Sequence, residues 1–240
     1  MEIINTKDRN IANTGTLLVT KSIGSLIVAS TLPFAQLTTE KIKIEIERAN
    51  GSNFEITKGN MSLKDFILLT TYNDDAITAD QNYALTAECE ICEGGSIQLN
   101  EKDVIRIELT GLKTAETYVL NGIEEPATSH AVLSFEQKSM SSDDTNKIFQ
   151  VHGHDLAILD KHSSIEEVAY TFDNGQVVKY TLFELSVLSR AIDPVAYVKA
   201  DGTVQSGFTD KLQLPLFGVD AIEIRKSQGA LINLILRKEA

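Results

Sequence analysis

The sequence has little cysteine, a shortage of positive charge and no long hydrophobic run, and each shortage excludes a class of protein. Two cysteines in 240 residues provide no disulfide framework, which suits a protein made in a reducing cytoplasm. The formal net charge of −12 argues against a protein that wraps nucleic acid, because phosphate neutralisation requires clustered Lys and Arg. The longest apolar runs, Leu26–Ala29 and Leu234–Leu236, are far too short to span a bilayer, and Met1–Asn10 does not have the hydrophobic segment of a signal peptide.

Signals of enzyme chemistry are also scarce. No glycine-rich phosphate loop follows a strand and opens a helix, and the sequence contains no Gly-x-Ser-x-Gly nucleophile turn. There is no tryptophan, and the six tyrosines and nine phenylalanines fall mostly at positions typical of a core. A β-sandwich binding module for a glycan or receptor is therefore only the second hypothesis, because such a module relies on exposed aromatic side chains.

What the sequence does contain is a series of short segments in which apolar and polar residues alternate. Ile42, Ile44 and Ile46 share one face of a strand, and charged residues occupy the other face. This pattern is typical of a half-buried antiparallel strand. The same alternation recurs over Val168–Phe172, where the first, third and fifth residues share a face.

Two short helices are predicted by their N-terminal residues. Ser62–Asp65 supplies a side-chain acceptor for the amide of Asp65, and Asp65 suits the positive end of the helix dipole. Thr181–Glu184 has the residue types of a capping box. The leucines that follow at a spacing of three predict packing of this second helix against its own barrel.

The strongest feature is that these landmarks occur twice in the same order. Their separations are nearly constant: 124 residues from Asn50 to Asn174, 119 from Ser62 to Thr181, and 117 from Asp103 to Asp220. The separation between matching landmarks decreases slowly along the chain, which is what loop deletions in a duplicated domain would produce. The alternative is a single β-rich domain with coincidental hairpins.

Each half holds about eight short strands at spacings of ~8–12 residues, with one short helix. That number suits an eight-stranded jelly roll, which covers its own inner faces within one half of the chain. The sequence therefore predicts an all-β protein made of two tandem eight-stranded jelly-roll β-sandwiches, each with a short helix. The predicted domains are residues 1–125 and 126–240.

This pattern resembles the double jelly-roll major capsid proteins of tailless, membrane-containing bacteriophages, in particular the small members in corticoviruses and lipid-containing flavobacterial phages. The residues that carry the resemblance are Lys43–Glu47 leading to Ser62–Leu68, and Tyr170–Gly175 leading to Leu182 and Leu185. In that family, a strand ending in a turn and followed by a short leucine-rich helix recurs in both barrels. The likeness extends over most of the chain.

The resemblance implies a structural virion protein without enzymatic activity or cofactor. It implies a homotrimer whose six barrels form a pseudo-hexameric tile, and an icosahedral capsid of such tiles over an internal lipid membrane. The implied partners are further copies of the chain, penton proteins, membrane-associated virion proteins and the membrane beneath the shell, with no direct contact to nucleic acid. The protein would be made in the host cytoplasm and reside in the virion capsid.

Two motifs invite comparison with metal or redox sites. Cys89–Cys92 is a Cys-x-x-Cys motif, but in an alternating strand its thiols face opposite sides, and neighbouring glutamates discourage thiolate formation. His152 and His154 would point the same way on a strand and could hold one metal, as in cupins. However, hydrophobic residues occupy positions 158 and 159, where a cupin's glutamate falls, and Asp160 and His162 would need special geometry to substitute.

A cupin-like metal protein is therefore the third hypothesis, and a solvated loop or strand edge is the favoured interpretation of the two histidines. The acidic stretches Asn73–Asp75 and Ser142–Asp144 supply oxygen ligands of the kind that calcium prefers. Neither follows the spacing of a calcium-binding hand loop, so the sequence favours solvated turns. We predict no catalytic, cofactor-binding or metal-binding residues.

Overall fold

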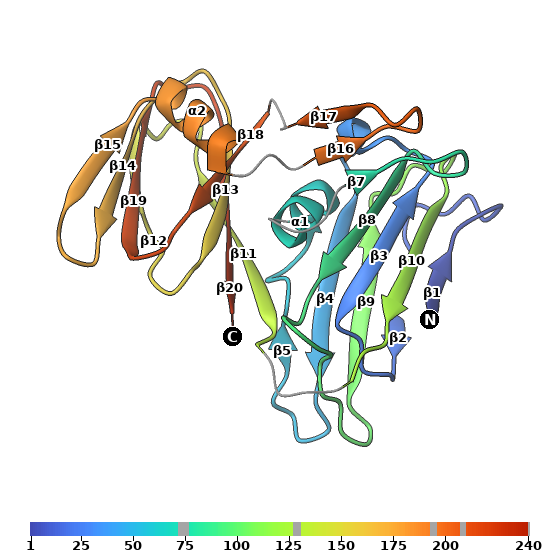
Figure 1. Cartoon of the computed structure of the whole chain (residues 1–240). Helices are drawn as coiled ribbons and strands as arrows, with labels where there is room; N and C mark the ends of the chain where they lie inside the picture. Colours follow the sequence, from blue (N-terminus) through green and yellow to red (C-terminus); the bar gives the residue numbers. More distant parts are fainter. Residues whose placement is uncertain (72–76, 127–130, 193–195, 207–209, 240) are drawn as a thin grey trace. The chain divides into compact units, whose positions relative to one another are not determined.

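The computed structural model describes residues 1–71, 77–126, 131–192, 196–206 and 210–239 (Figure 1). The chain divides into two compact units. The first unit comprises Met1–Phe135 with Val195–Gln205, and the second comprises Glu136–Pro194 with Ser206–Glu239. The domains predicted from the duplication, residues 1–125 and 126–240, stay a prediction.

The first unit is a sandwich of two sheets. Its first sheet has the order β1 (Glu2–Asn5), β10 (Tyr118–Ile123), β3 (Ser25–Ser30), β8 (Leu85–Glu90), β7 (Ile77–Thr78), β16 (Ala196–Val198) and β17 (Val204–Ser206). Its second sheet has the order β2 (Leu17–Val19), β9 (Val104–Thr110), β4 (Lys41–Glu47) and β5 (Phe54–Glu55), and β6 (Met61–Ser62) also pairs with β4. The helices in the described part of this unit are the 3-10 helix η1 (Phe34–Gln36) and α1 (Leu63–Thr70).

The second unit repeats this arrangement with two four-stranded sheets. The first has the order β11 (Leu133–Met140), β20 (Ile232–Glu239), β13 (Leu156–Asp160) and β18 (Lys211–Pro215). The second has the order β12 (Asn146–Gln150), β19 (Val219–Lys226), β14 (Ile165–Phe172) and β15 (Val177–Tyr180). Helix α2 (Leu182–Ile192) follows β15.

Both units have the topology of an eight-stranded jelly roll. When β6, β7, β16 and β17 are set aside, the strands of each unit, numbered along the chain, pair in the orders 1-8-3-6 and 2-7-4-5. In both units the helix connects strands 5 and 6. The predicted fold, two tandem jelly-roll sandwiches each with a short helix, is confirmed.

The duplication extends to the register of individual residues. Ile46 in β4 lies opposite Ile105 in β9, and Tyr170 in β14 lies opposite Ile222 in β19. The turns that follow also match, because the asparagine side chain of each Asn-Gly pair accepts a hydrogen bond from the backbone amide two residues on, at 3.0 and 2.9 Å. The glycine that directly follows each asparagine, Gly51 or Gly175, has a φ of 82° or 80°, a left-handed conformation that favours glycine.

The helix caps form as the sequence predicted. The Ser62 hydroxyl accepts a hydrogen bond from the Asp65 amide at 3.4 Å. In α2 the Thr181 hydroxyl accepts from the Glu184 amide at 3.3 Å, while the Glu184 carboxylate accepts from the Thr181 amide at 2.7 Å. The second pair is a reciprocal capping box.

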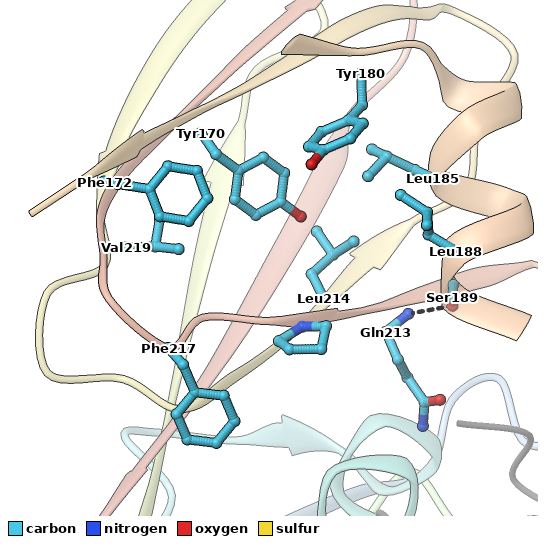
Figure 2. A pocket seen from close by; sticks show the side chains of 11 residues that line it. Tyr170, Phe172, Tyr180, Leu185, Leu188, Ser189, Gln213, Leu214, Phe217 and Val219 are labelled. Carbon is cyan, nitrogen blue, oxygen red and sulfur yellow. Dashed lines mark hydrogen bonds between the residues drawn. The ribbon is translucent and has the colours of Figure 1, made fainter. Parts of the chain in front are cut away.

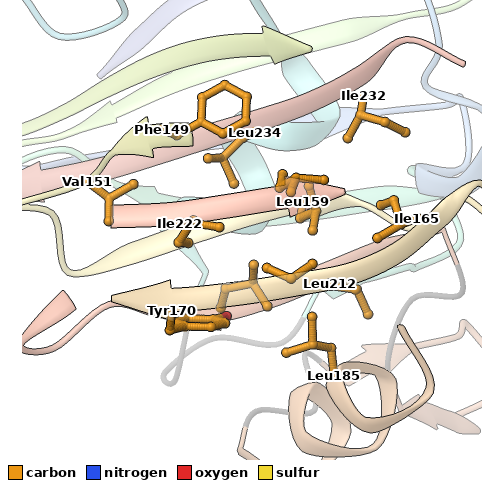
Figure 3. Close-up of a cluster of buried hydrophobic side chains, with 14 of the residues drawn as sticks. Phe149, Val151, Leu159, Ile165, Tyr170, Leu185, Leu212, Ile222, Ile232 and Leu234 are labelled. Atoms are coloured by element: carbon orange, nitrogen blue, oxygen red, sulfur yellow. The ribbon is translucent and has the colours of Figure 1, made fainter. Parts of the chain in front are cut away.

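Each unit has its own hydrophobic core between its sheets. In the first unit, the isoleucines of β4 that the sequence placed on one face are at most 1% exposed. In the second unit, Phe149 and Ile222 from one sheet pack with Leu159 and Leu234 from the other, and Leu185 of α2 joins them, as Figure 3 shows. No helix in the described part of the chain is long and apolar enough to cross a membrane.

One segment late in the sequence belongs to the first unit. Strand β16 pairs in parallel with β7, with Tyr197 opposite Ile77 and Val198 opposite Thr78. The amide of Ala79 extends this pairing by donating to the carbonyl of Val198 at 2.8 Å. This strand therefore adds to the sheet of the first jelly roll, although its residues lie in the second half of the sequence.

Candidate interaction surface

The two cysteines are placed as core residues. Cys89 is 0% and Cys92 is 1% exposed, and the two, both in the described part of the chain, are not joined by a disulfide. Strand β8 ends at Glu90, so the expectation of opposite faces, which assumed one continuous strand, does not apply to Cys92. Burial raises the pKa of the Cys92 thiol, and the charges of Glu90 and Glu125 raise it further. Cys92 is therefore kept protonated, a form that is neither a strong nucleophile nor a metal ligand.

His152 and His154 lie in a turn that follows the end of β12. The Nδ1 atom of His152 is 2.8 Å from a carboxylate oxygen of Asp220, whereas Nδ1 of His154 is 3.0 Å from the carbonyl oxygen of Val151. Burial lowers the pKa of His154 below its usual value. Each imidazole thus has its own partner, and the two do not share one.

The residues considered as substitutes for a cupin ligand set are engaged elsewhere. Asp160 forms an ion pair with Lys211 at 2.7 Å, and Nδ1 of His162 lies 2.8 Å from the Ser164 hydroxyl. Within the described ranges, no group of three or more His, Cys, Asp or Glu side chains could hold a metal ion.

The second acidic stretch is bound by the protein's own donors. The ammonium of Lys226, a residue that is 2% exposed, donates to the carbonyl of Ser142 at 3.2 Å. Gln228 donates to the carbonyl of Asp143 at 3.1 Å. The ammonium of Lys226, at the end of β19, therefore reaches this loop and opposes the binding of a second cation there. The first acidic stretch, Asn73–Asp75, lies outside the described residues.

The outer face of α2 is an exposed apolar surface of the second unit. Phe183 is 76% exposed, Val187 is 51% and Leu188 is 39%, whereas Leu185 on the inner face is 3% exposed. Phe183 and Val187 are four residues apart and therefore lie on the same side of the helix. We name Phe183, Val187 and Leu188 the α2 face.

Helix α1 occupies the same position in the first unit, but its large apolar side chains are buried. Those that are at most 1% exposed are Leu63, Phe66, Ile67, Leu68 and Leu69. The ring of Phe66 packs edge-on against the ring of Phe135, with centroids 5.4 Å apart and an interplanar angle of 76°.

Backbone hydrogen bonds hold Phe135 beside this helix. The Phe135 amide donates to the carbonyl of Ile56 at 2.7 Å, and the Lys58 amide donates to the carbonyl of Phe135 at 2.9 Å. The helix of the first unit is thus covered by Phe135, which lies at the end of the first segment of that unit and within strand β11. The described residues do not cover the α2 face to the same extent: Phe183 remains 76% exposed and Val187 remains 51% exposed.

A pocket of about 180 Å³ lies beside α2 in the second unit (Figure 2). Its lining comes from β14, β15, α2, β18, the segment that joins β18 to β19, and the start of β19: Tyr170, Phe172, Tyr180, Leu185, Leu188, Ser189, Gln213, Leu214, Pro215, Phe217 and Val219. The sequence predicted that Tyr170 and Phe172 share a face but gave no sign of a pocket. The α2 face was missed as well, although large apolar residues on two sides of one helix could have revealed it.

The arrangement of two complete jelly rolls in one chain defines a double jelly-roll protein, and comparisons with known proteins agree. No family model and no curated protein matches the sequence. Among solved structures, the major capsid protein of bacteriophage PM2 has a TM-score of 0.55 at 10% identity, covering 95% of this chain and 93% of that one. The major capsid protein of Sulfolobus turreted icosahedral virus has a TM-score of 0.54 at 11% identity, covering 95% and 91%. The resemblance inferred from the sequence is thereby confirmed, and at these identities it shows a shared fold.

Proposed function

We propose that this chain is a structural, non-enzymatic protein of a viral capsid. The observation that carries the proposal is the pair of complete jelly rolls in one chain, similar over nearly its whole length to two viral major capsid proteins. Two barrels of like topology give each chain two nearly equivalent outlines, so a ring of three chains has nearly sixfold edges. Repeated contacts between such edges close into a shell.

The proposed assembly is a homotrimer that forms a pseudo-hexameric tile of an icosahedral capsid over an internal lipid membrane. Its partners would be other tiles, penton proteins and membrane-associated virion proteins. The net charge of −12 is compatible with this arrangement, because the membrane would separate the shell from the nucleic acid. The protein would be made in the host cytoplasm and reside in the virion.

Within this assembly we assign the α2 face to the contact between two copies of the chain. In the first unit, the equivalent helix is covered by Phe135 and its neighbours in the same chain. In the second unit, two side chains of the α2 face are more than half exposed. A second copy that packs a segment on Phe183 and Val187 would remove this apolar surface from water, which is a favourable change.

Sedimentation of the purified chain over a wide concentration range tests the proposal. The expected result is a species with three times the chain mass of 26.3 kDa, together with ring-shaped particles of nearly sixfold outline in electron micrographs. A monomer at all concentrations, with no assembly after addition of lipid vesicles, would contradict it.

A further inference from the structure

The pocket beside α2 is lined by a tyrosine hydroxyl that is available to a ligand. Tyr170 is 6% exposed, and its hydroxyl forms no hydrogen bond within the described part of the chain. Figure 2 shows this hydroxyl directed toward the middle of the pocket, with Tyr180 beside it. The hydroxyl is not among the buried polar atoms of the described residues that have no partner, so it is open to the pocket. A molecule in the pocket that accepts from this hydroxyl would take the place of water there.

The duplicated fold shows that the jelly roll does not require this hydroxyl. At the equivalent register position the first unit has Ile46, which is 1% exposed and lies opposite an isoleucine of the neighbouring strand, as Tyr170 does. An aliphatic side chain therefore fills this position in one copy of the fold. The fold therefore does not require Tyr170, the residue at this position in the second unit, and its hydroxyl belongs to the lining of the pocket.

The walls of the pocket define the chemistry of a ligand. No charged side chain is among the described lining residues, and Leu185, Leu214 and Val219 supply apolar surface. The ring of Tyr180 stands edge-on to the ring of Tyr170, with centroids 5.5 Å apart. Burial, with a smaller contribution from Tyr180, raises the pKa of Tyr170 well above its usual value, so its hydroxyl stays a proton donor.

The volume limits the size of the ligand. A buried apolar cavity of about 150 Å³ accommodates benzene. The pocket, at about 180 Å³, therefore has room for one six-membered ring with a single small substituent. Neutral molecules are favoured, because a charge would be desolvated here without a counter-charge.

We propose that this pocket binds a small neutral molecule, a single aromatic or alicyclic ring with one oxygen that accepts a hydrogen bond from the Tyr170 hydroxyl. The ring would lie against Leu185, Leu214 and Val219. The proposal does not depend on the capsid assignment, because it rests only on residues of the second unit.

Fluorine NMR of the full chain with two matched probes tests this. The probes are 4-fluorophenol and fluorobenzene, which differ only in the hydroxyl group. We expect 4-fluorophenol to bind with a dissociation constant of about 0.1–1 mM, in the range set by its few heavy atoms. In Tyr170→Phe, 4-fluorophenol should bind about fivefold more weakly, whereas fluorobenzene should bind as before, because only the first probe loses a hydrogen bond.

Two further variants make the test specific. Val219→Phe places extra volume at the pocket wall and should weaken both probes at least about tenfold, with folding checked by circular dichroism. Tyr83→Phe, a change to a tyrosine of the first unit, should alter the binding of neither probe. The proposal is overturned if neither probe binds at several millimolar, or if Tyr170→Phe affects both probes equally. Both results are independent of the oligomer mass, so they leave the capsid proposal standing.

Discussion

Truncating Phe183 to alanine should weaken assembly of the chain without unfolding it. Full burial of a phenylalanine side chain stabilises by about 1.5–3 kcal/mol. Because 76% of Phe183 is exposed in a single chain, its burial by a second copy contributes roughly 1–2 kcal/mol per contact. A trimer has three equivalent contacts, so its free energy of assembly should fall by roughly 3–6 kcal/mol in Phe183→Ala.

The assay is sedimentation equilibrium, with the concentration of half-dissociation as the measured quantity. For a trimer this concentration varies as the square root of the dissociation constant, so the expected increase is roughly 10- to 150-fold. Leu231→Ala is the matched control, since Leu231 is 58% exposed in the loop before β20. A shift of less than about twofold for Phe183→Ala, or an equal shift for the control, would refute the assignment of the α2 face.

Three further predictions concern stability. Phe66→Ala should lower the free energy of unfolding by about 3–5 kcal/mol in urea titrations, because it opens a cavity against Phe135. Tyr118→Phe should cost about 1–3 kcal/mol by the same method, since the Tyr118 hydroxyl donates to the buried Glu40 carboxyl at 2.9 Å. Hydrogen bonds from two backbone amides, and then an arginine, hold the pKa of Asp103 well below its usual range. Its stabilising contribution is therefore present above pH ~4 and is lost as the pH falls below it, so acid titrations of Asp103→Asn should show a shallower loss of stability than the parent.

The sequence predicted best those elements whose residues alternate strongly. The alternating residues of β4 and the turn and capped helix that follow are signals of local chemistry, and the second unit has an alternating strand, an Asn-Gly turn and a capped helix in the same order. Strand β1 was not predicted, because Glu2–Asn5 is a short edge strand held by its pairing with β10. Strand β11 was not predicted either, since Glu136–Lys138 interrupts its hydrophobic pattern, and the strand is stabilised by its place in the sheet.

The candidate surface required tertiary structure. The leucines of α2 at a spacing of three predicted an inner face, and Leu185 is buried and Leu182 packs against the core as expected. The third leucine, Leu188, is 39% exposed, so the predicted face is covered only in part. Periodicity alone does not show whether a second stripe of apolar residues is covered by another segment. In α1 it is covered, through Phe135, and in α2 Phe183 is left exposed. The pocket likewise depends on five elements that meet only in the folded unit.

The differences between the two jelly rolls at equivalent positions separate what folding needs from what it does not. Arg48 and Phe172 are equivalent, because the carbonyl of each accepts the hydrogen bond that closes the turn three residues later. Arg48 forms an ion pair with Asp103 at 2.9 Å, whereas Phe172 lines the pocket. At both pairs of equivalent positions the second unit has an aromatic residue, Phe172 or Tyr170. The first unit has Arg48 and Ile46 there, which pair or pack within the first unit itself. Since one copy folds without these aromatic side chains, the fold does not require them. This supports the proposals that the pocket binds a small molecule and that the α2 face contacts a second copy.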